Sequence, residues 1–164
     1  MIKYLLFICL LISSHLNATQ IYGKVVGVTD GDTIKVLDAD NTLHKIRMYG
    51  IDAPEKKQPF GQKAKGHLSS MVFSKNVRVN IINADRYGRS VGIVYLKDGF
   101  TRNSVNLDMI IEGYAWAYLQ YIKALEDRIL YAECQDKAKN LKLGLWVDKN
   151  PTAPWEYRKS KKRK

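Results

Sequence analysis

Short runs in which apolar and polar residues alternate dominate the chain between Ile21 and Leu96. The alternation predicts about five short strands, at residues 21–28, 33–37, 42–51, 77–81 and 91–96. Asp30-Gly31, between the first two runs, is a pair typical of hairpin turns. In the third run Ile46 and Met48 fall on one face, so Arg47 is expected on the opposite, partly polar face.

Apolar residues three or four positions apart predict three helices. The first covers residues 60–73, the second ends near Gly113, and the third covers residues 125–143 and ends at Gly144. In the third helix, the residues expected to be buried are Leu125, Ile129 and Ala132. Strands interleaved with helices indicate an α+β domain, mainly a small closed or nearly closed β-barrel covered by helices.

The first residues have the pattern of an export signal. Met1-Ile2-Lys3 is cationic, residues 4–12 are apolar, and residues 13–18 become polar and small. We expect a signal peptide at residues 1–18, cleaved after Ala18, and therefore a secreted or periplasmic protein. A leader that stays attached would instead anchor the protein to the membrane. The apolar run is shorter than the ~20 residues of a membrane-spanning helix, and no later segment qualifies.

The composition adds a preference for polyanions. The 164 residues, 46% of them hydrophobic, suffice for one compact domain, which we place at residues 19–157. The 27 Lys and Arg against 16 Asp and Glu give a formal charge of +11, which attracts nucleic acid but would also serve solubility alone. Residues 158–164 form a basic C-terminal tail, expected to be disordered and to raise non-specific affinity by counterion release.

Three charged clusters add candidate chemistry. They are Asp30-Gly31-Asp32-Thr33, then Arg47 through Asp52-Ala53-Pro54-Glu55, and finally Asp85-Arg86-Tyr87-Gly88-Arg89. The carboxylates Asp32, Asp52 and Glu55 could hold a hard cation and deprotonate a water. Two guanidinium groups, those of Arg47 and Arg89, could clamp one phosphate through paired hydrogen bonds. Phosphoryl chemistry asks for little beyond positioning, charge neutralisation and an activated water.

In order and spacing these clusters resemble the staphylococcal, or micrococcal, nuclease family. Asn106 through Ala115 and Gly144-Leu145-Trp146 extend the resemblance, so that it covers residues 21–155. It implies an OB-fold barrel of five strands covered by three helices. It also implies a Ca²⁺-dependent endonuclease that cuts DNA and RNA with little sequence preference and leaves 3′-phosphate ends. A monomer without a stable protein partner is expected.

The resemblance implies a role for each matching residue. Asp32 and Asp52 would bind Ca²⁺ together with the backbone carbonyl of Ala53, where the family commonly has threonine. Glu55 would activate the attacking water. The scissile phosphate would be bound by Arg47 and Arg89.

Aromatic residues near the expected site depart from the family pattern. By resemblance, Tyr87 would contact a nucleotide phosphate and Tyr121 would flank the base pocket. Leu119 replaces a second pocket tyrosine, so base stacking is expected to be weaker or rearranged, with Tyr118 as a partial substitute. Packing at the barrel edge would explain these side chains equally well.

Two other functions fit part of the sequence. A non-catalytic OB-type module that binds nucleic acid would use the basic and aromatic residues, but it would not need Asp32, Asp52 and Glu55 together. A secreted protein that binds membranes or acidic polymers would use the charge and the tail, and would leave all three clusters unexplained. His44 and His67 lack the spacing of zinc or hydrolase sites.

Overall fold

The computed structural model describes residues 19–97 and 103–162. The expected signal peptide at residues 1–18 therefore lies outside the described residues. Within the described ranges, no helix combines the length and apolar character needed to cross a membrane.

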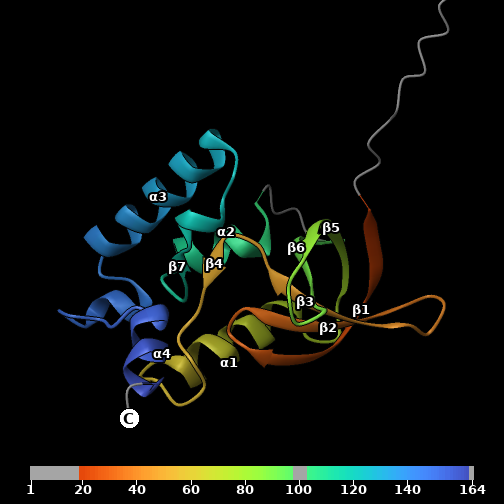
Figure 1. Cartoon of the computed structure of the whole chain (residues 1–164), viewed down its shortest axis with the longest axis horizontal. Coiled ribbons are helices and arrows are strands. Elements are labelled where there is room, and N and C mark those ends of the chain that lie inside the picture. Colours follow the sequence, from red (N-terminus) through yellow and green to blue (C-terminus); the bar gives the residue numbers. More distant parts are fainter. Residues whose placement is uncertain (1–18, 98–102, 163–164) are drawn as a thin grey trace, which may run out of the picture.

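Five strands form a closed barrel in the order β1-β2-β3-β6-β5 (Figure 1). They are β1 (Gln20–Asp30), β2 (Thr33–Asp38), β3 (Leu43–Met48), β5 (Asn76–Ala84) and β6 (Ser90–Leu96). Neighbours pair antiparallel except β3 and β6, which run parallel. Closure satisfies the backbone groups that an open sheet would leave at its edges. The expected five-stranded OB-type barrel is confirmed.

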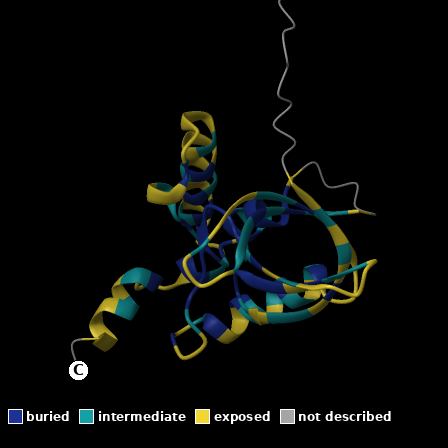
Figure 2. Ribbon diagram, turned by 45° about the vertical axis from the view of Figure 1, so that its right-hand side comes forward, coloured by how far each residue is buried: buried dark blue, intermediate teal, exposed yellow. Residues whose placement is uncertain are grey.

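Alternating side chains fill the barrel, as the sequence predicted. Figure 2 shows the strands as a ring along which buried residues recur. The inward-facing residues are Val25, Ile34, Val36, Ile46, Met48, Val77, Val79 and Val94. One buried polar residue, Asn106, joins this core to a helix. Its amide donates to the carbonyls of Tyr49 and Gly92 and accepts from the Val94 N–H, so each buried polar atom has a partner.

Of the four helices in the described residues, two pack on the barrel, α1 (Gly61–Val72) and α2 (Val105–Ile111), and two lie to one side of it, α3 (Leu125–Asn140) and α4 (Pro154–Lys162) (Figure 1). Two short 3-10 segments, η1 (Leu119–Tyr121) and η2 (Gly144–Val147), lie before and after α3. A two-stranded ribbon pairs β4 (Ile51–Asp52) with β7 (Trp116–Ala117). The first two predicted helices are confirmed, with bounds within a few residues.

The predicted buried face of α3 is wrong. Leu125 and Ile129 are 63% and 50% exposed, whereas the buried residues are Tyr131, Gln135 and Ala138. Apolar residues occur on more than one side of this helix, so their spacing did not single out the packed face. The buried face also includes a glutamine, whose Oε1 accepts the Ala117 N–H, and an apolar pattern does not register such a residue.

The third predicted strand is broken near its end. Gly50 has φ +74°, a left-handed conformation that glycine adopts without strain, and it turns the chain out of the barrel. As a result β4 leaves the barrel and pairs with β7 instead. The turn places Asp52 beside the barrel, close to residues of the β1–β2 hairpin.

The predicted disordered tail is a helix as far as Lys162. Pro154 occupies its first position, where a missing N–H costs nothing, and basic residues fill its last turn. Trp155 packs α4 against the domain, with its ring 5.2 Å from that of Tyr118 and 5.5 Å from that of Trp116. Hydrophobic contact at its start therefore docks this basic segment, although its composition is that of a solvated tail.

Candidate active site

Residues from the first two charged clusters meet around one guanidinium group. Arg47 on β3 lies 3.0 Å from Asp32 through Nη1 and 3.0 Å from Asp52 through Nη2. The side chains of Asp32 and Asp52 are only 8% and 1% exposed. Carboxylates separated by twenty positions in the chain are thus held together by one partly buried cation.

Strand register accounts for this meeting. Thr33 and Arg47 are cross-strand partners, and the Met48 N–H donates to the Asp32 carbonyl at 2.8 Å. The Asp32 carboxylate also accepts from the Ala53 N–H at 2.8 Å and from the Thr33 hydroxyl at 3.0 Å. The hairpin turn is therefore tied directly to the chain segment that follows Asp52.

Two glycines allow the segments of the site to approach one another. A Cβ on Gly31 would lie 2.7 Å from the Cβ of Ala53 and 2.9 Å from that of Ala64, so a larger residue would push the hairpin turn away. A Cβ on Gly61, at the start of α1, would lie 1.9 Å from the Glu55 carbonyl oxygen. Close backbone packing at both positions fixes the loop that carries Glu55.

Glu55 lies at the edge of the cluster formed by Asp32, Arg47 and Asp52, on a loop that hydrogen bonds hold in place. Its N–H donates to Oε1 of Gln58 at 3.1 Å, and its carbonyl accepts the Gln58 N–H at 2.8 Å. The Gln58 amide in turn donates to the Thr152 carbonyl at 2.7 Å. The Glu55 side chain is 41% exposed, so water reaches it although its backbone is held in place.

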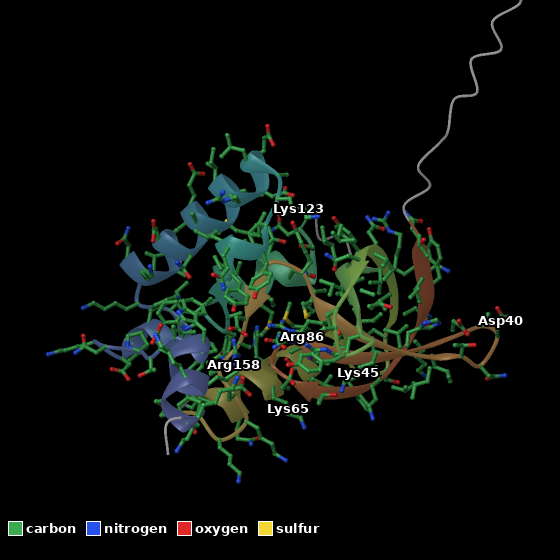
Figure 3. All side chains as sticks on the ribbon, viewed as in Figure 1. Asp40, Lys45, Lys65, Arg86, Lys123 and Arg158 are labelled. Atoms are coloured by element: carbon green, nitrogen blue, oxygen red, sulfur yellow. The ribbon has the colours of Figure 1, made fainter. Side chains whose placement is uncertain are left out.

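Arg158 of α4 is a site residue that the sequence did not reveal. Its Nη2 donates to Oδ2 of Asp52 at 2.7 Å, and its Nη1 donates to Oε1 of Glu55 at 2.7 Å and to Oδ1 of Asp52 at 3.2 Å. Figure 3 shows Arg158 between α4 and the barrel. Pro154 marks a helix start and could have revealed α4. No spacing pattern could have revealed a contact between residues about a hundred positions apart.

The third cluster lies in the turn between β5 and β6. Nε of Arg89 is 2.6 Å from Oδ2 of Asp85, whose Oδ1 accepts the N–H groups of Tyr87 and Arg89. Burial alone would raise the pKa of Asp85, but these hydrogen bonds and the Arg89 charge lower it. Among the hydrogen bonds and ion pairs of the described residues, none joins Arg89 to Asp32, Asp52 or Glu55. Tyr87 is exposed, and its ring lies 5.6 Å from the Arg89 guanidinium.

Aromatic rings border the site. The ring of Tyr118 stacks on Trp155 at 5.2 Å and lies 4.5 Å from the exposed ring of Tyr121. Burial and then the negative charge of Asp52 raise the pKa of Tyr118, consistent with a position near the carboxylates. Leu119 packs against the core instead. Tyr118 therefore places a ring beside Tyr121, and its role as a partial substitute in base stacking stays a prediction.

Burial and repulsion from Asp32 disfavour the charged form of Asp52, and two arginines oppose both effects. Burial raises the pKa of Asp52, and the charge of Asp32 adds to the rise, whereas Arg158 and Arg47 counteract both. Burial and the charge of Asp32 also raise the pKa of Asp30, to about 7. Removing Arg47 would leave the buried Asp32 without an arginine partner, whereas Asp52 would keep Arg158.

The donor set suits a hard cation. Carboxylate and carbonyl oxygens are the ligands that Ca²⁺ and Mg²⁺ prefer. Within the part of the chain that the structure describes, no group of three or more His, Cys, Asp or Glu side chains is placed to hold a metal ion. Asp32, Asp52 and the Ala53 carbonyl would therefore need water or substrate oxygens to complete a coordination shell, which is common for such ions.

Comparisons with known proteins agree on one family. The family model described as staphylococcal nuclease homologue matches residues 45–148. An uncharacterized endonuclease of Haemophilus influenzae is 41% identical over 139 residues, which cover 85% of this chain and 74% of the relative. A micrococcal nuclease of Shigella flexneri is 39% identical, covering 85% of this chain and 82% of the relative. A staphylococcal-like nuclease, CAN1 of Arabidopsis thaliana, is 39% identical over 72% of this chain and 34% of its own length.

Two glycines of α1 provide a matched test of the packing that holds Glu55. Gly61→Ala should destabilise the protein by about 1–3 kcal/mol, because its Cβ would collide with the Glu55 carbonyl. Gly66→Ala on the same helix meets nothing within 4 Å and should stabilise it by about 0.5–1 kcal/mol. Urea unfolding of both variants measures these changes. Equal effects at the two positions would disprove a special role for the Gly61 contact.

Proposed function

This chain belongs to the staphylococcal nuclease family and is an endonuclease, and we propose that it is exported and cuts DNA and RNA in a Ca²⁺-dependent reaction. Little sequence preference and 3′-phosphate products are part of the proposal. The observation that carries it is the buried pair of aspartates bridged by Arg47, with Glu55 at their rim. These carboxylates and this arginine suit phosphodiester hydrolysis, because the reaction needs a neutralised phosphate charge and an activated water.

Asp32, Asp52 and the backbone carbonyl of Ala53 are proposed to hold Ca²⁺. Their oxygen donors fit a hard ion. The chemistry that Ca²⁺ supplies at such a site is neutralisation of phosphate charge and a lower pKa for a bound water. Asp32 is fixed by the Ala53 N–H and by Arg47, so its carboxylate is oriented before any ion binds.

Glu55 is the proposed base. Its carboxylate would accept a proton from the attacking water, whose oxygen bonds to phosphorus while the bond to the 5′ oxygen breaks. The leaving 5′ oxygen takes up a proton, and the phosphate stays on the 3′ side. Exposure of the Glu55 side chain lets water reach the carboxylate, and the hydrogen bonds of its backbone hold the loop that carries it.

Arg47 and Arg89 are proposed to bind the scissile phosphate and to stabilise the charge that develops on it. Arg47 already stands against both aspartates. Arg89 would act from the β5–β6 turn, where Asp85 orients its guanidinium. Tyr87 in the same turn and Tyr121 beside Tyr118 would contact the flanking nucleotides.

A basic groove beside Glu55 supports a polyanionic substrate. It runs between α4 and the loop that follows Glu55, and its other lining residues are Lys56, Lys57, Tyr157, Arg158, Lys161 and Lys162. Five cations against one carboxylate give a surface that fits a phosphodiester strand. The groove gives the basic C-terminal segment a defined position next to the proposed base.

Export is proposed from the sequence of residues 1–18 alone. The mature protein would then be secreted or periplasmic, or held at the membrane if the leader is not removed. A monomer without a stable protein partner is proposed as well. Millimolar Ca²⁺ outside cells would suit a site with few protein ligands.

Removal of the proposed base tests the mechanism. Glu55→Gln should lower turnover by ~10²–10⁴, the usual contribution of a positioned general base. Glu133→Gln, which makes the same change at an exposed position on α3, should leave turnover unaffected. Single-turnover cleavage of an oligonucleotide in saturating Ca²⁺ measures both. Full turnover in Glu55→Gln would remove Glu55 from the mechanism.

Two lysines of the groove test the substrate assignment. Lys161→Gln combined with Lys162→Gln should weaken binding of single-stranded DNA and reduce the salt slope of log K by ~1.4, as expected for two lost phosphate contacts. The matched pair Lys137→Gln with Lys149→Gln removes the same charge from exposed positions on and beyond α3. Fluorescence anisotropy in EGTA measures affinity without cleavage. Identical slopes for the two double variants would contradict a role for the groove.

A further inference from the structure

Arg158 and Arg47 together fill most of the acceptor positions of Asp52. A carboxylate offers about four lone-pair sites, two on each oxygen. Oδ1 of Asp52 accepts from Arg47 at 3.0 Å and from Arg158 at 3.2 Å, and Oδ2 accepts from Arg158 at 2.7 Å. Only about one site on this nearly buried carboxylate remains free.

The guanidinium of Arg158 also holds Glu55. Its Nη1 lies 2.7 Å from Oε1 of Glu55, so one planar cation bridges the proposed metal ligand and the proposed base. Burial alone would lower the pKa of Arg158, but hydrogen bonds and charges from Asp52 and Glu55 raise it instead. Arg158 therefore stays charged and paired in this arrangement.

We propose that Arg158 is a positioning residue of the active centre, a place-holding cation that a divalent metal ion must displace from Asp52 and Glu55. The inference rests on the proposed assignment of Asp52 as a metal ligand. Arg158 would hold the two carboxylates in place in the metal-free enzyme. It would also weaken the affinity of the site for metal, because the ion and the guanidinium compete for the same oxygens.

Arg158, rather than Arg47, is the cation that can leave. Arg47 is 15% exposed and is held by two aspartates and the Met48 carbonyl. Arg158 is 39% exposed and comes from a helix near the end of the chain. Its side chain can turn into the basic groove without disturbing α4, because Trp155 and Tyr157 dock that helix separately.

Arg158 lies beyond the residues that the family model matches. The family model covers residues 45–148, whereas α4 begins at Pro154. Asp52 and Glu55 fall inside the match, whereas Arg158, which pairs with both, falls outside it.

Metal binding without substrate tests the proposal. Calorimetric titration of the metal-free full chain with Ca²⁺ should give a Kd about tenfold to a hundredfold lower in Arg158→Gln than in the wild type, from the loss of competing charge-assisted hydrogen bonds. Lys159→Gln is the matched control. It removes the same charge at the next position of α4, which is exposed, and should change Kd by less than about threefold.

Two further variants make the result decisive. Arg158→Lys keeps the charge but cannot bridge both carboxylates, so its Kd should fall between those of the wild type and Arg158→Gln. Asp52→Asn should abolish the titration if the ion binds where proposed. An Arg158→Gln Kd equal to or higher than that of the wild type would overturn the inference while leaving the proposed function intact. Undiminished binding in Asp52→Asn would instead overturn the metal assignment on which both depend.

Discussion

The ion pairs of Arg47 with Asp32 and Asp52 are the interaction on which the rest of the site depends. Two carboxylates with almost no access to water repel each other and lose hydration, at a cost of several kcal/mol for each unpaired ion. One guanidinium offsets both effects because its planar fork reaches both acids. The barrel register that sets Thr33 opposite Arg47 and the turn at Gly50 are therefore as much a part of the site as its charged groups.

Asp32, Asp52, Glu55 and Asp85 each have an arginine partner in the structure. Arg47 and Arg158 neutralise the buried acids and Glu55, and Arg89 pairs with Asp85. Under the proposed function, a metal ion would enter by replacing Arg158 at Asp52 and Glu55, while Arg47 keeps its aspartate partners. Charges would stay compensated throughout, which avoids the penalty of a bare buried ion at any stage.

Much of this arrangement could be predicted from local sequence. Strict alternation around Arg47 indicated the side of the strand from which it projects, and helical spacing gave α1 its bounds within a residue. Features that depend on tertiary contacts were missed. The packed face of α3 includes Gln135, whose burial depends on a hydrogen bond to Ala117, and the basic composition after Trp155 concealed a docked helix. The Arg158 contacts join chain segments that no periodicity relates, so only the folded structure reveals them.

The most direct test of the proposed function is to map the products of the chain beginning at Thr19 acting on single-stranded DNA, double-stranded DNA and RNA. Parallel reactions would contain Ca²⁺, Mg²⁺ or EGTA. The proposed mechanism predicts that Ca²⁺ supports cleavage of all three, that EGTA abolishes it, and that every cut leaves a 3′-phosphate. Cleavage that persists in EGTA, or cuts that leave 5′-phosphate ends, would contradict the roles given to Asp32, Asp52 and Glu55.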